Sequence, residues 1–88
     1  MPARPLFFGT NFKMHQTAEE SARFYRDLSL TASVTGEDDP QLFVIPPATS
    51  LAAVGELAKS DDARIWIGAQ NMHWAPEGAW TGEVSAAM

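Results

Sequence analysis

The chain has 88 residues, enough for one small domain or for a piece of a larger one. Its hydrophobic content of 45% excludes a mainly disordered chain. The net charge of -5 argues against a general affinity for nucleic acid or for an anionic membrane surface, because both need basic patches.

The first half of the chain predicts a strand, a helix and a second strand. Residues 6–10 form a continuous apolar run, typical of a strand covered on both faces in a parallel sheet. Thr17 and Glu20 have the spacing of a capping box, so a helix is expected to begin there. A polar turn at residues 33–40 leads to a second buried strand at residues 42–45. The inner face of the helix is predicted from apolar residues at helical spacing: Ala18, Ala22, Tyr25, Leu28 and Ala32.

The second half repeats this pattern and then departs from it. Residues 50–59 predict a helix and residues 65–69 a third strand. The loop at residues 70–83 is longer than the usual connection of about two to six residues, which often indicates function. Residues 85–88 resemble the first turn of a third helix.

Strands that alternate with helices predict an α/β fold with a parallel sheet and right-handed crossovers. A domain seldom stops in the first turn of a helix, and a small parallel sheet has bare edges. We therefore expect the natural chain to continue past Met88 or other chains to cover these edges.

Two polar residues follow the first strand directly. Ligands of parallel α/β sheets bind beyond the carboxyl ends of the strands, where Asn11 and Lys13 are placed. On extended backbone their spacing points both side chains to the same side, so that an amide and a cation would face a phosphate or a developing oxyanion. The spacing alone also fits a solvated lysine beside a turn-forming asparagine.

Three segments resemble motifs of the triosephosphate isomerase family. Residues 11–14, Asn-Phe-Lys-Met, resemble its Asn-Trp-Lys-Met, and residues 69–71 are similar to its Ala-Gln-Asn. Residues 78–85, Gly-Ala-Trp-Thr-Gly-Glu-Val-Ser, resemble its Gly-Ala-Phe-Thr-Gly-Glu-Ile-Ser. The three segments occur in the family's order among the predicted strands, and the resemblance extends over residues 6–88.

This resemblance implies a (β/α)8 TIM barrel. Residues 1–88 would be the N-terminal part of a single barrel domain, with the first three parallel strands and the first two helices, truncated at the start of the third helix. The implied reaction interconverts glyceraldehyde 3-phosphate and dihydroxyacetone phosphate through an enediolate, without a cofactor. The family's catalytic His and Glu are not recognisable in these 88 residues, so the segment alone is expected to be inactive.

The resemblance also implies roles for single residues. Lys13 would be catalytic, acting on the substrate phosphate and carbonyl oxygen, and Asn11 would position the substrate. In the family, the loop that matches residues 70–83 inserts into a second subunit, which implies a homodimer. Thr81 would then support the partner's Asn11, Glu83 would form an ion pair between chains, and Gln70 would brace the strand end behind the site.

Departures from the family pattern leave the substrate open. Phe12 replaces the usual Trp, Trp80 replaces Phe or Tyr, and residues 15–16 are His-Gln where Asn-Gly is frequent. Together they indicate a divergent branch, for which a tetrulose phosphate is the alternative substrate. Met14 is expected in the core.

Other readings of the sequence remain. His15 and His73 are expected to be turn or surface residues, and they lack the acidic or thiol partners that a metal site needs. The loop with Trp74 and Trp80 fits an interface but could fold back on its own strands. As hypotheses of another class, the chain could be a non-catalytic oligomerisation module or a phosphate-binding module that depends on Lys13. With no cysteine, no export signal and no apolar run of about 20 residues, we expect a cytoplasmic protein without a membrane partner.

Overall fold

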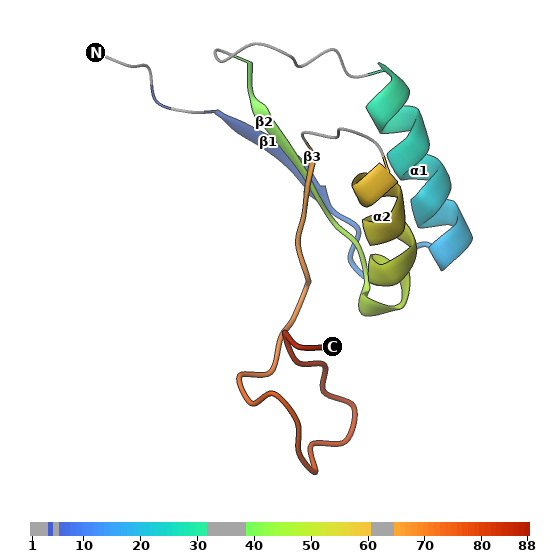
Figure 1. Ribbon diagram of the computed structural model, residues 1–88. Helices are drawn as coiled ribbons and strands as arrows, with labels where there is room; N and C mark the ends of the chain where they lie inside the picture. The colour runs from blue at the N-terminus through green and yellow to red at the C-terminus, as the bar shows by residue number, and fades with distance from the viewer. Residues whose placement is uncertain (1–3, 5, 32–38, 61–64) are drawn as a thin grey trace.

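The computed structural model describes residues 4, 6–31, 39–60 and 65–88. Its elements are β1 (Phe7–Asn11), α1 (Ala18–Thr31), β2 (Gln41–Ile45), α2 (Ala48–Ser60) and β3 (Ile65–Ile67). The sheet order is β1-β2-β3, and both strand pairs are parallel. Figure 1 shows α1 and α2 side by side on one face of the sheet. The predicted arrangement of parallel strands and helices, as at the start of a TIM barrel, is confirmed.

The register of the sheet assigns the side chains to two faces. Phe8 pairs with Leu42, which pairs with Ile65 on the next strand. In the same way Val44 pairs with Ile67. Residues in register share a face and alternate with their neighbours along each strand. Because Val44 and Ile65 are buried, this is the face that the helices cover.

The hydrophobic core lies between this face and the helices. Tyr25 of α1 and Val54 of α2 are almost completely buried. Phe12, just after β1, packs edge-on against Phe24 with ring centroids 5.1 Å apart. The core cluster consists of Phe12, Tyr25, Val44, Val54 and Ile65, and Leu28, Leu42, Leu57, Ala58 and Ile67 pack against it.

The first turn of α1 has the predicted capping box. The backbone N–H of Thr17 donates to Glu20 Oε1 (2.9 Å), and that of Glu20 donates to Thr17 Oγ1 (3.2 Å). Two donors that a helix start leaves unpaired are thereby satisfied. The predicted inner face is buried at Ala22 and half-buried at Leu28, whereas Ala32 and most of the predicted polar turn lie outside the described residues.

A buried pair of hydroxyl groups joins the two helices, which the sequence patterns did not indicate. Ser21 of α1 and Ser50 of α2 are both fully buried, with a hydrogen bond of 3.0 Å between their Oγ atoms. Ser21 Oγ also donates to Gln16 Oε1 (3.2 Å). With one hydrogen on each hydroxyl, the arrangement is satisfied when Ser50 donates to Ser21. The loop between β1 and α1 is therefore tied to both helices.

The prediction that the first strand is covered on both faces is wrong for the described residues. All of β1 is exposed. On the helix-free face Phe7 and Trp66 lie with ring centroids 5.7 Å apart and are 52% and 59% exposed. The run of apolar residues was read correctly as a strand, but a covering layer for this face has to come from residues other than those described.

Two smaller predictions also fail. Met14 was expected in the core and is 95% exposed, because it follows the turn that takes the chain out of the sheet. No helix begins at residues 85–88. Instead Ser85 forms a parallel bridge with His73, in which the N–H of His73 donates to the carbonyl of Val84 (2.8 Å).

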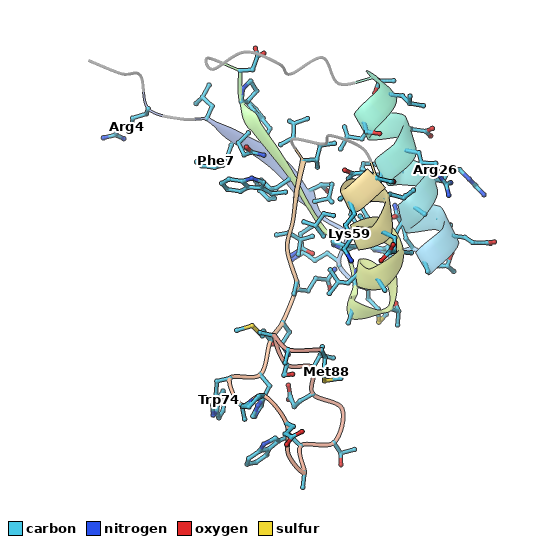
Figure 2. The ribbon with its side chains drawn as sticks, in the orientation of Figure 1. Arg4, Phe7, Arg26, Lys59, Trp74 and Met88 are labelled. Carbon is cyan, nitrogen blue, oxygen red and sulfur yellow. The ribbon has the colours of Figure 1, made fainter. Side chains whose placement is uncertain are left out.

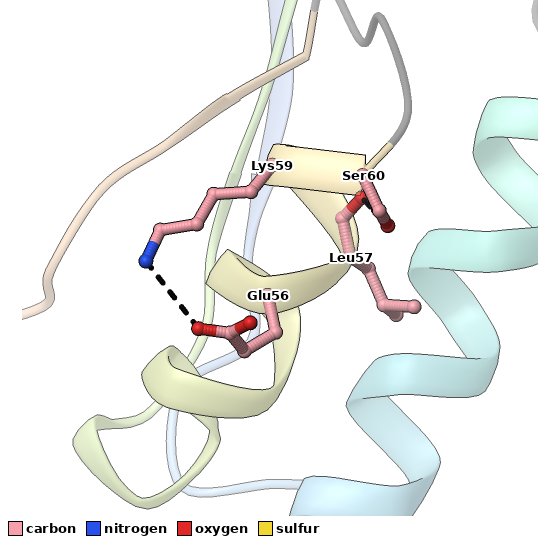
Figure 3. A network of polar contacts seen from close by, with 4 residues as sticks. All are labelled: Glu56, Leu57, Lys59 and Ser60. Carbon is pink, nitrogen blue, oxygen red and sulfur yellow. Dashed lines mark hydrogen bonds and ion pairs between the residues drawn. The ribbon is translucent and has the colours of Figure 1, made fainter.

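The last turns of α2 are shown in Figure 3. Lys59 Nζ forms an exposed ion pair with Glu56 (3.3 Å), and Ser60 Oγ donates to the carbonyl of Leu57 (3.1 Å). An exposed pair of this kind contributes little to stability, about 1 kcal/mol or less. Neither described helix is long and apolar enough to cross a membrane.

Candidate functional site

Asn11 and Lys13 lie at the carboxyl end of β1, as predicted, and both are exposed. The N–H of Phe12 still donates to the carbonyl of Ile45 (3.0 Å), so the pairing with β2 continues one residue past the strand. At Lys13 the backbone turns into the left-handed region, with φ of 58°. The expectation that both side chains project from extended backbone is therefore wrong at Lys13.

Two side chains form hydrogen bonds with the backbone N–H and carbonyl of Lys13. Its N–H donates to Asn11 Oδ1 (2.9 Å), and its carbonyl accepts a hydrogen bond from Gln70 Nε2 (2.9 Å). A left-handed conformation costs an ordinary residue about 1–2 kcal/mol. Such a conformation persists where the surroundings determine it, and these places cluster at functional sites.

The arrangement offers hydrogen-bond donors to a ligand. Asn11 Oδ1 already accepts one hydrogen bond, from the N–H of Lys13, and the Asn11 amide nitrogen has no partner among the described residues. The Lys13 ammonium is also a donor without acceptor capacity. The amide N–H groups of Asn11 and the ammonium of Lys13 are donors, which suits them to an anionic or carbonyl oxygen.

No described carboxylate neutralises this lysine. The ion pair between two described residues joins Lys59 to Glu56, on α2 (Figure 3), and does not involve Lys13. The part of the chain that the structure describes holds no group of three or more His, Cys, Asp or Glu that could bind a metal ion. No described carboxylate therefore competes with a ligand for the charge of Lys13.

Gln70 also lies next to this site, although it follows the strand at the opposite edge of the sheet. It follows β3, and β2 lies between β3 and β1. Its Nε2 donates to the carbonyl of Ile45 (3.1 Å) as well as to that of Lys13. The structure therefore brings Asn11, Lys13 and Gln70 together at the carboxyl ends of the strands.

Beyond its base at residues 70–72, the loop at residues 70–83 projects away from the sheet and helices (Figure 1). It does not fold back on its own strands, which was the alternative expectation. Trp74 lies on this projecting part (Figure 2) and is 85% exposed, and Trp80 is about half-exposed. Thr81 and Glu83 are exposed on the same loop, which turns through Gly82 at a φ of 87°.

His73 organises the loop and was misjudged from sequence as a turn or surface residue. Its side chain is buried, and its ring stacks on Trp74 and Trp80 with centroid distances of 4.2 and 5.1 Å. Its Nδ1 accepts a hydrogen bond from the N–H of Ala75 (3.0 Å). The signal was the pair of Trp residues near it, which was interpreted only as an interface.

Comparisons with known proteins agree with these observations. The family model "Triosephosphate isomerase" matches residues 6–88. The chain is 43% identical over 82 residues to L-erythrulose-1-phosphate isomerase of Brucella abortus, which covers 93% of this chain and 31% of the relative. It is 41% identical over 88 residues to triosephosphate isomerase of a Synechococcus species, which covers 97% of this chain and 34% of the relative. For L-erythrulose-1-phosphate isomerase of Mesorhizobium japonicum the identity is 47% over 81 residues, with 91% and 30% covered. The chain thus spans about a third of the length of these relatives.

Proposed function

This chain belongs to the triosephosphate isomerase family, and we propose that the protein containing it isomerises a small phosphorylated sugar. The observation that carries the proposal is the pair of hydrogen-bond donors at the carboxyl end of β1, the amide nitrogen of Asn11 and the ammonium of Lys13. A sugar phosphate has the anionic and carbonyl oxygens that such a pair would bind. We propose glyceraldehyde 3-phosphate and dihydroxyacetone phosphate as the substrate pair.

In this proposal Lys13 acts on charge that develops during the reaction. Removal of a proton from the carbon beside a carbonyl gives an enediolate, whose negative charge is concentrated on oxygen. A fixed cation near that oxygen stabilises the transition state more than the ground state. Asn11 would orient the substrate by donating from its amide nitrogen. The reaction is a proton transfer, so it requires no cofactor.

The proton itself would be moved by groups outside the motifs found here, so we propose that residues 1–88 alone are inactive. We also propose that these residues form part of a single barrel domain. The proposed substrate also suggests a location. A phosphorylated sugar is charged and crosses membranes poorly, which supports a cytoplasmic enzyme.

A tetrulose phosphate is the second candidate substrate. It is supported by the names of the relatives, since L-erythrulose-1-phosphate isomerases occur beside a triosephosphate isomerase at similar identity. The departures at Phe12 and Trp80 do not separate the two candidates, because Phe12 packs against Phe24 in the core and Trp80 lies in the projecting loop.

The test is an assay of the intact parent protein on glyceraldehyde 3-phosphate and on L-erythrulose 1-phosphate. Lys13→Ala should lower kcat/KM by about 10²-fold or more, as removal of one oxyanion donor does in other enzymes. Lys59→Ala is the matched control, because that lysine pairs only with Glu56 on the surface of α2, and it should stay within about twofold. Wild-type kcat/KM for Lys13→Ala, or no turnover of either substrate by the parent, would refute the proposal.

We further propose that the loop at residues 70–83 docks into a second copy of the chain to form a homodimer. The exposure of Trp74 and Trp80 supports this, because aromatic residues are enriched in interfaces. In this dimer Thr81 would contact the partner's Asn11, and Glu83 would form an ion pair between the chains, with Gln70 bracing the strand end behind the site.

Sedimentation of the intact parent protein tests the dimer. Trp74→Ala should raise the dissociation constant at least about tenfold, as loss of an interface aromatic often does. Leu30→Ala is the control, because Leu30 is equally exposed (84%) but lies on α1. An unchanged monomer–dimer equilibrium in Trp74→Ala would contradict the docking role. A dimeric parent that turns over neither sugar phosphate would instead favour a non-catalytic oligomerisation module.

A further inference from the structure

We infer that Gln70 is a positioning residue for Lys13. Its side-chain amide holds the Lys13 carbonyl and thereby fixes the left-handed backbone from which the ammonium is presented to a ligand. This role goes beyond support of a subunit interface, and it rests on the proposed function of Lys13.

The geometry shows how one amide group can do this. Gln70 Nε2 donates to the carbonyl of Lys13 (2.9 Å) and to that of Ile45 (3.1 Å). An amide nitrogen carries two hydrogens, so both bonds can exist together. The Ile45 carbonyl also accepts from Phe12 N (3.0 Å), in the β1–β2 pairing. Gln70 is thus anchored on β2 while it holds the residue that follows β1.

Lys13 needs these hydrogen bonds because its backbone conformation is energetically unfavourable. A residue with a Cβ avoids φ near 58° unless contacts compensate for the strain. Asn11 binds the N–H of Lys13, and Gln70 binds its carbonyl. Without the Gln70 amide, one of these two contacts is gone and the residue is free to relax toward the common regions of backbone space.

Relaxation would move the ammonium without removing it. A change in φ rotates the Cα–Cβ bond, and the long lysine side chain amplifies this rotation at Nζ. A displacement of about 1 Å in a catalytic group can lower the rate about 10²-fold. Gln70 would therefore affect the rate although it does not touch the substrate.

A double-mutant cycle in the intact parent protein separates positioning from general support of the fold. The variants are Gln70→Met, which keeps the length of the side chain but has no donor, Lys13→Ala, and the two together. Gln70→Met should lower kcat/KM at least about tenfold in the wild-type background. In the Lys13→Ala background it should change kcat/KM less than about twofold, because the group that it positions is absent.

Gln41→Met is the matched control. Gln41 lies in β2, and its Nε2 donates to the carbonyl of Leu42 (2.8 Å), so the control also removes a glutamine amide from the sheet. It should leave kcat/KM within about twofold of wild type in both backgrounds. Gln70→Asn, which keeps the amide but shortens its reach, replaces Gln70→Met if that variant does not fold.

The outcomes distinguish the two proposals. If Lys13→Ala lowers activity but Gln70→Met lowers it equally in both backgrounds, Gln70 supports the fold and the positioning role is wrong. If Lys13→Ala retains full activity, the proposed function of Lys13 is wrong. A crystal structure of the Gln70 variant then tests the backbone conformation of Lys13 separately from activity. If Lys13 keeps a φ near 58°, the inference is overturned. If its backbone moves out of the left-handed region, the inference is supported.

Discussion

The left-handed backbone of Lys13 predicts that Lys13→Gly is more stable than Lys13→Ala. Both substitutions remove the ammonium and the methylene chain, so the comparison isolates the backbone. Glycine adopts a φ near 58° without a steric cost, whereas alanine keeps the Cβ that makes this region unfavourable. At most positions in regular structure the order is the reverse, because glycine loses more conformational freedom on folding.

The magnitude follows from two opposing effects. The left-handed conformation costs alanine about 1–2 kcal/mol. The greater freedom of glycine in the unfolded chain costs about 0.5–1 kcal/mol. The centres of these ranges leave about 0.8 kcal/mol in favour of Lys13→Gly. In equilibrium urea unfolding this corresponds to a midpoint about 0.5 M higher for Lys13→Gly than for Lys13→Ala, at the slopes typical of small proteins.

Thr10 provides the control. It lies in β1, where it pairs with Val44 on extended backbone. There Thr10→Gly should be less stable than Thr10→Ala by about 0.5–1 kcal/mol, which is the opposite order at a position close by. If Lys13→Ala unfolds at the same urea concentration as Lys13→Gly or at a higher one, residue 13 is not strained. Gln70 would then have no backbone strain at residue 13 to compensate for.

Two further predictions concern the elements around the site. The hydrogen bond from the Thr17 backbone N–H, together with the Thr17 side chain and the nearby charge of Arg23, holds the pKa of Glu20 below its ordinary value of 4.5. The stabilisation by Glu20 is therefore complete above this value and lost as the pH falls through the lower folded-state pKa. Glu20→Gln should thus melt below wild type at about pH 7, and the gap should narrow as the pH falls below 4.5. A gap independent of pH would contradict the assignment. The second change is Gly9→Ala, which places a methyl group where the Phe43 ring lies and should cost about 1–3 kcal/mol in urea unfolding, with partial recovery in Gly9→Ala/Phe43→Leu. A wild-type midpoint for Gly9→Ala would show that the ring moves aside freely.

The elements of the fold could be predicted because their signals are local. Thr17 and Glu20 are three residues apart, and their side chains form the two bonds that this spacing indicates. Short apolar runs located β2 and β3 because both are bounded by turn or polar residues. The exposure of β1 could not be predicted in the same way. An apolar run indicates what a strand can bury, but what covers it depends on other parts of the protein.

The backbone of Lys13 has no local signal. Lysine is not a residue that favours the left-handed region, and nothing in residues 11–14 alone requires it. The contact that completes its support comes from Gln70, which is 57 positions away in the sequence. The positions of Asn11, Lys13 and Gln70 near strand ends could be predicted from the sequence. Their hydrogen bonds could not, because these depend on the register in which the strands pair. His73 is the converse case, since its aromatic neighbours were visible and only their contact with its ring was missed.

The exposed aromatic face and Asn11 are related through β1, because side chains alternate between the two faces of a strand. Asn11 lies on the same face of the strand as Phe7, the helix-free face that also carries Trp66. In a (β/α)8 barrel this face is the packed interior, and the strand ends beside it form the active-site mouth. Strands that complete such a barrel would cover Phe7 and Trp66 and, at the mouth, would remove water from one side of the site at Asn11 and Lys13. Because the energy between charges rises as the surrounding dielectric falls, the remaining strands of a barrel would strengthen the electrostatic action of Lys13 as well as bury the aromatic rings.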